Sequence, residues 1–179
     1  MRIILAFVLT VYAGLAAAQD GGVMPPFYRG MEKGPTLLAA DGAFLQRALQ
    51  SHDGDAVAAA QSWVGLAWAE INEGDAETAV RRFNQAFLLD PTNPGLAYGL
   101  MIATHLRGDD FAVVDGLYEE ALAALPPDDQ QFARVDYAQI LVMRGEVARA
   151  VEILDPYKDD PRAAEILAHI NQLNSEAAQ

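Results

Sequence analysis

One stretch of the sequence, residues 63–91, constrains the fold more than any other. It spaces a tryptophan, small residues, a loop glycine and a proline as two antiparallel helices joined by a short turn require. Ala67 and Ala79 are small enough to let the two helices approach closely, and Phe83 can fill the space between them. Pro91 cannot continue a helix, so it should end the second one. The stretch therefore predicts a helical hairpin.

The turn of this hairpin recurs along the chain. Gly74-Asp75 is matched by Gly108-Asp109 and again by Gly145-Glu146, a spacing of about 35 residues that is typical of helical repeats. The second copy starts at Pro94 and the third near Asp128, and each turn is followed by apolar residues at helical spacing. We therefore expect three hairpins stacked on one another.

Both ends of the repeat region are also predicted to be helical. A helix is expected from Thr36 to Gln50, interrupted or capped at Asp41-Gly42. The last helix should begin at Pro161, behind Asp160 as its N-cap, and its single apolar stripe would close the open end of a repeat array to water. The sequence thus predicts an all-α fold: a helical-repeat solenoid of about three repeats over residues 36–174, with an N-terminal helix and a C-terminal capping helix.

The hairpins resemble the tetratricopeptide repeat. The run from Arg82 to Ala86, followed by Leu88 to Pro91, is similar to a family of exported tetratricopeptide proteins of Gram-negative bacteria, and the resemblance covers residues from Phe44 to Leu154. It implies a TPR-like helical scaffold in the cell envelope and carries no catalytic residues that could be transferred. Glu70 departs from the repeat pattern, which usually has an aromatic residue there.

The N-terminal sequence predicts a secretory signal peptide. Arg2 is followed by an apolar run from Ile3 to Ala17, and small residues before Gln19 predict cleavage after Ala18. A membrane anchor is the alternative, but the run is shorter than the roughly 20 residues that cross a bilayer. With no cysteine at the cleavage point for lipid attachment, residues 1–18 predict a soluble periplasmic protein. Residues 19–35 should form a flexible leader and residues 175–179 a disordered tail.

The chain is strongly acidic, with a net charge of −13 at pH 7. Binding to nucleic acid requires clustered lysine and arginine, so we expect none, and we expect no stable membrane insertion after signal cleavage. The excess of acid either keeps the protein soluble or attracts a cationic partner.

Residues that could support catalysis are few. The chain has no cysteine and three histidines that lie far apart, His52, His105 and His169, whereas zinc normally takes three or four ligands of these types. Asp109-Asp110 and Asp128-Asp129 precede helices, where carboxylates serve as caps. We therefore predict no enzyme, no metal and no cofactor.

Asn84 and Gln85 stand inside a predicted helix, although asparagine is a poor helix former. Asn84 either makes a specific hydrogen bond to the next repeat or to a partner, or belongs to an exposed polar face.

The function predicted is that of a non-enzymatic scaffold that binds a protein or peptide partner; the alternative is a structural subunit or homo-oligomer of an envelope complex. By the resemblance, the first helix of each repeat lines a concave groove. Trp68 and Tyr98 would lie in it as binding residues, or else pack in the core. No lysine or asparagine is placed there to clamp a terminal carboxylate. The predicted groove residues are Gln61, Val64, Trp68, Ile71, Tyr98, Ile102, His105, Val135, Gln139 and Val142.

Overall fold

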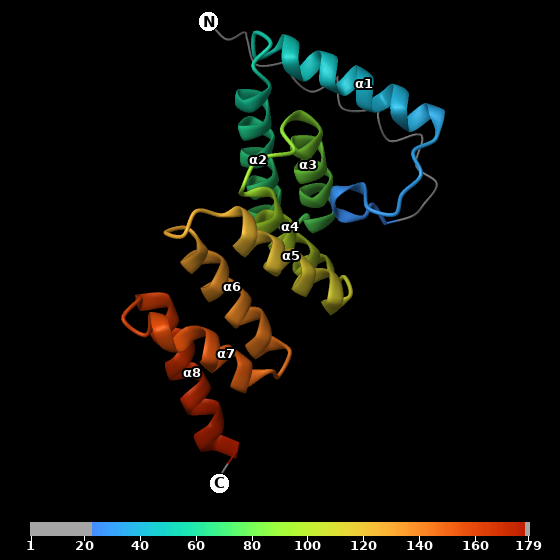
Figure 1. Ribbon diagram of the computed structural model, residues 1–179. Coiled ribbons are helices and arrows are strands. Elements are labelled where there is room, and N and C mark those ends of the chain that lie inside the picture. The colour runs from blue at the N-terminus through green and yellow to red at the C-terminus, as the bar shows by residue number, and fades with distance from the viewer. Residues whose placement is uncertain (1–22, 178–179) are drawn as a thin grey trace, which may run out of the picture.

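The computed structural model describes residues 23–177, and this part of the chain contains helices and no strands (Figure 1). The predicted signal peptide, residues 1–18, lies outside the described residues. Within these residues eight α-helices pack against one another, together with the short 3-10 turns η2 (Pro26–Tyr28) and η3 (Asp155–Tyr157). The helices are α1 (Pro35–Gln50), α2 (Ala56–Glu73), α3 (Ala76–Leu89), α4 (Leu96–Arg107), α5 (Phe111–Ala124), α6 (Gln130–Met143), α7 (Val147–Leu154) and α8 (Pro161–Ala177).

The three predicted hairpins are present as α2–α3, α4–α5 and α6–α7. Each turns at a glycine with positive φ: 83° at Gly74, 83° at Gly108 and 80° at Gly145. Residues with a Cβ rarely adopt this conformation, so glycine is required at the helix ends. The Asp75 carboxylate then accepts a hydrogen bond from the Thr78 backbone N–H at 2.9 Å, which caps α3.

The hairpins stack in chain order. The second helix of each hairpin packs on the helix that follows it, and the first helices α2, α4 and α6 and the terminal helix α8 contact one another in turn. Figure 1 shows this succession from α2 and α3 at one end to α8 at the other, with α1 lying across the end of α2. Every hairpin thus has neighbours along the stack, as a repeat array requires.

The core follows the sequence prediction closely. Phe83, Ala67 and Ala79 are fully buried. The Phe83 ring lies against α4 at Gly99, where an added Cβ would stand 2.3 Å from two ring atoms. A glycine at this position is therefore what allows the second helix of one hairpin to approach the first helix of the next.

One predicted interruption is wrong. α1 runs without a break through Asp41 and Gly42. A helix can bear the roughly 1 kcal/mol cost of one interior glycine because Phe44 and Ala48, in its second half, are buried with Ala59 of α2.

None of the helices described here is long and apolar enough to span a membrane.

Candidate functional site

The ten predicted groove residues lie on α2, α4 and α6, and we call the surface they mark the first-helix face. Their burial varies. Two are exposed, Gln61 and Gln139, and Val135 is buried; the remaining seven are partly buried, namely Val64, Trp68, Ile71, Tyr98, Ile102, His105 and Val142. The face is therefore a packed surface with polar and apolar side chains reaching its exterior.

Trp68 and Tyr98 form part of this face and also make contacts in the core. The Trp68 ring packs on Tyr98 with centroids 5.5 Å apart, and edge-on against the buried Phe83 at 5.8 Å. These contacts join the first hairpin to the second. Core packing, the alternative considered for these two aromatic residues, therefore accounts for these ring contacts.

A line of polar contacts continues from Tyr98 across the face. The Tyr98 hydroxyl donates a hydrogen bond to the carboxylate of Asp136 on α6, and Arg162 of α8 pairs with the same carboxylate. Burial, followed by the bond to Asp136, raises the pKa of Tyr98, so the hydroxyl remains a donor. Together with Trp68, these residues connect α2, α4, α6 and α8 side by side.

Two exposed apolar residues on this face were missed in the sequence. Leu106 on α4 is 53% exposed and Met143 on α6 is 69% exposed. Both stand two positions before the turn glycine of their hairpin, and this equivalence was the signal available in the sequence. Leu106 directly follows the predicted groove residue His105, and Met143 directly follows Val142.

The ends of α4 and α6 that carry these residues lie close together. The Arg144 guanidinium carbon, one residue past Met143, lies 4.1 Å from the centroid of the Phe111 ring, and Phe111 is four residues past the end of α4. Burial first, and then the Arg144 charge, lower the pKa of His105. Tyr98 and Asp136 meet nearer the start of the same two helices. The helices therefore run in the same direction, and Leu106 and Met143 fall at the same end.

A repeated ion-pair motif fastens the hairpins, and the sequence analysis did not identify it. Arg107 precedes the turn at Gly108. It pairs with Asp109, just after that turn, at 2.6 Å and with Glu77 of α3, the second helix of the preceding hairpin, at 3.0 Å. The prediction that Asp109 is a helix cap is therefore wrong, because its carboxylate is engaged by this guanidinium group.

Arg144 repeats the arrangement at the next turn. It pairs with Glu146 beyond the turn at 2.7 Å and with Asp115 of the preceding second helix. Burial alone would raise the pKa of Asp115, but hydrogen bonds from Arg144 and Tyr137 outweigh it and hold that pKa below its usual value. Both arginine side chains are only 9% exposed, so the motif is structural.

Of the other aspartates predicted to cap helices, Asp110 does so and Asp129 does not. Asp110 caps α5 by accepting from the Ala112 N–H at 2.8 Å, as expected. Asp129 precedes α6 but makes no side-chain cap hydrogen bond, because its backbone is already helical and capping requires an extended N-cap residue. Residues 23–177 contain no cluster of three or more His, Cys, Asp or Glu side chains that could hold a metal ion.

Asn84 has a specific role inside the protein. It is fully buried; its Oδ1 accepts from the Phe27 N–H at 2.7 Å, and its Nδ2 donates to the Pro25 carbonyl at 2.8 Å. The exposed-polar-face alternative is wrong for Asn84, whose partner is the chain's own segment before α1. The neighbouring Gln85 accepts from Trp63 Nε1 at 2.7 Å.

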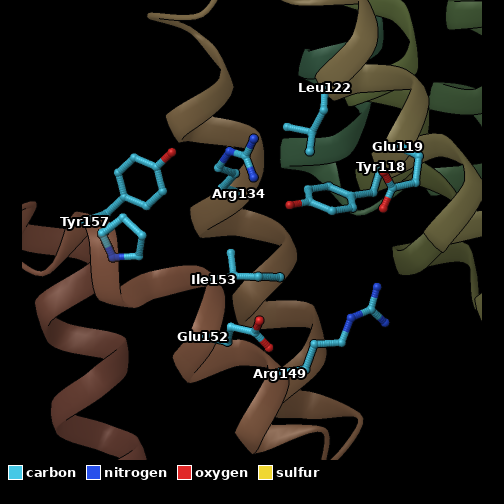
Figure 2. Close-up of a pocket in the computed structure, with 9 residues that line it drawn as sticks. Tyr118, Glu119, Leu122, Arg134, Arg149, Glu152, Ile153 and Tyr157 are labelled. Atoms are coloured by element: carbon cyan, nitrogen blue, oxygen red, sulfur yellow. The ribbon is translucent and has the colours of Figure 1, made fainter.

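The described surface also contains an open cavity of about 550 Å³ between α5, α6, α7 and η3 (Figure 2). Arg134 stands between the rings of Tyr118 and Tyr157 in this view. The cavity is lined by Tyr118, Glu119, Leu122, Arg134, Arg149, Glu152, Ile153, Pro156 and Tyr157.

No protein-family model matches the chain, and no curated protein sequence is significantly similar to it.

Proposed function

We propose that this chain is a tetratricopeptide-like solenoid, exported to the periplasm, that acts as a non-enzymatic scaffold and binds a protein or peptide partner. Three hairpins turning at left-handed glycines, stacked with their first helices in mutual contact, support the solenoid. The apolar N-terminal run and the small residues before Gln19 support export.

The observation that carries the binding function is the exposure of Leu106 and Met143 on neighbouring first helices. An isolated exposed leucine is ordinary, whereas apolar side chains gathered at one place commonly mark an interface. Ile102 and Val142 lie beside them, partly buried, and extend the apolar surface. A partner's amphipathic helix or extended segment would cover this end of the first-helix face.

The contacts beneath this surface hold it in a fixed shape. Trp68, Tyr98, Asp136 and Arg162 connect the three first helices, α2, α4 and α6, with α8. Because the helices do not have to be ordered when a partner arrives, little conformational entropy is lost on binding. Specificity would come from the apolar residues, and the acidic surface would mainly speed encounter with a cationic partner.

The alternative is a structural subunit or homo-oligomer, in which a second copy covers the same apolar residues. Sedimentation velocity of the mature protein separates the two possibilities. A monomer across the micromolar range favours a scaffold for a different partner, and a stable dimer that is dissociated by Met143→Glu favours self-association.

The binding function is tested by affinity capture from a native envelope extract with the double variant Leu106→Glu, Met143→Glu. These residues are changed because they are exposed, so a loss of binding would not reflect a damaged core. The matched control is Leu38→Glu, Val151→Glu, which places the same charges on α1 and α7 at exposed apolar positions. We expect the first variant to lose the partner that the wild type and the control retain; retention by both variants would contradict the proposal.

A further inference from the structure

The side of the stack formed by the second helices already holds one peptide, the chain's own residues 24–29. Asn84 binds its backbone through the Phe27 N–H and the Pro25 carbonyl. The Phe27 ring packs edge-on against Phe87 of α3 at 4.9 Å, and Arg29 pairs with Glu120 of α5 at 2.5 Å. The segment thus reaches from one second helix, α3, to the next, α5.

The open cavity occupies the equivalent place one hairpin further along. Phe83, Ala86 and Phe87 of α3 correspond in helix position to Tyr118, Ala121 and Leu122 of α5, and the burial agrees, with Phe83, Ala86 and Ala121 at 0% and Tyr118 at 4% exposed.

Two residues that hold the N-terminal segment therefore have counterparts in the cavity wall. Phe87 corresponds to Leu122 and Asn84 to Glu119, and both counterparts line the cavity. In the first groove these positions contact a peptide; in the second they face open space.

We propose that the cavity between α5 and α7 is a binding site for a short partner peptide that carries an apolar residue next to a carboxylate. The apolar side chain lies on Leu122 and Ile153, as Phe27 lies on Phe87 in the first groove. The Glu119 carboxylate accepts a backbone N–H of the peptide, as Asn84 Oδ1 does.

The charge of the ligand follows from Arg134. Arg134 lines the cavity and forms no ion pair among the described residues, and its hydrogen bond to Gln130 within α6 is long, at 3.4 Å. The Tyr118 and Tyr157 hydroxyls lie to either side of it (Figure 2). A planar guanidinium group next to hydroxyl donors is suited to a carboxylate.

The cavity should also reject the chain's own N-terminal sequence in trans. That segment contains Arg29, which pairs with Glu120 in the first groove, whereas Arg134 and Arg149 line the second groove. A cationic residue there would face like charge, and only Glu119 and Glu152 at the exposed rim would offset it. The site therefore differs in specificity from the occupied groove.

The test is a titration, followed by ¹H–¹⁵N NMR, with acetyl-Pro-Pro-Phe-Asp-amide and with the same peptide ending in Asn-amide. We expect saturable shifts at backbone amides of α5 and α7, with the Asp peptide binding roughly tenfold more tightly, the effect of one charge-assisted hydrogen bond. Absence of saturation, or equal affinities for the two peptides, would overturn the proposal.

Two variants assign the charge preference to this cavity. Arg134→Gln should remove the advantage of the Asp peptide, and the control Arg47→Gln, at an exposed arginine on α1, should preserve it. Glu152→Gln, also exposed, should tighten binding of the Asp peptide without helping the Asn peptide; it remains informative if Arg134→Gln does not fold. An unchanged preference in folded Arg134→Gln, or in Glu152→Gln, would refute the assignment. Leu106→Glu, Met143→Glu should leave these titrations unaltered, which separates this site from the first-helix face.

Discussion

Replacing Gly99 by alanine tests the packing between the first two hairpins. The added Cβ would stand 2.3 Å from two atoms of the Phe83 ring, well inside the ordinary carbon contact distance of about 3.5–4 Å. Because Phe83 is fully buried, its ring cannot swing into solvent to relieve the clash. Either α4 must move away from α3 or the ring must leave its rotamer.

Two effects of opposite sign set the magnitude. Overpacking of a core costs about 1–3 kcal/mol, and the short distance to two ring atoms places Gly99→Ala at the upper end of that range. Alanine in a helix interior is favoured over glycine by about 1 kcal/mol. The net expectation is a loss of about 2 kcal/mol in the free energy of unfolding.

Gly116→Ala on α5 is the matched control. An added Cβ there has no atom within 4 Å, so only the propensity gain of up to about 1 kcal/mol remains. Urea denaturation followed by circular dichroism at 222 nm measures both variants. The difference between them should approach 3 kcal/mol; if Gly99→Ala stabilises the protein as much as Gly116→Ala does, Phe83 does not lie where we describe it.

Three further predictions rest on the structure and one on the sequence. Phe83→Ala should lower the free energy of unfolding by about 3–5 kcal/mol, and a change below about 1 kcal/mol would show that the ring is not buried. Asn84→Ala should release the segment before α1, so that the Phe27 amide exchanges with solvent much faster while amides of α4 do not. Equal exchange rates of the Phe27 amide in the variant and the wild type would show that its hydrogen bond to Asn84 does not hold the segment. The pKa of Asp115 is lowered in the folded state, so the stability it contributes is present above the unfolded carboxyl pKa of about 4 and is lost as the pH falls through the lower folded value; thermal melts of Asp115→Asn should show a weaker dependence on pH below about 5. Intact mass of the exported protein should correspond to cleavage after Ala18, and a mature chain that retains Met1 in the membrane fraction would mean an anchor instead.

The hairpins could be predicted because their signals are local. The turn glycines, and the apolar residues at helical spacing that follow them, lie within single hairpins, and their recurrence identified the repeat. The break expected at Gly42 was wrong for the opposite reason. Burial of Phe44 against other helices, which is not a local property, outweighs the poor helix propensity of glycine.

Most of the candidate sites depend on residues that are distant in the sequence. Asn84 bonds a segment 57 residues away, and no periodicity connects the two. The cavity around Arg134 requires three helices and a 3-10 turn to be placed together. Leu106 and Met143 are the exception, because their equal distance from the turn glycines was visible in the sequence; their exposure was not.

Site-specific photo-crosslinking in the native envelope tests the central claim, partner binding on the first-helix face, most directly. A photoreactive amino acid at Leu106 or at Met143 should give a discrete adduct larger than the chain itself, and the same group at Leu38 or Val151 should not. An adduct of twice the chain's mass would identify a second copy as the partner and support the homo-oligomer. Adducts from Leu38 or Val151, with none from Leu106 or Met143, would contradict the claim that this face binds the partner.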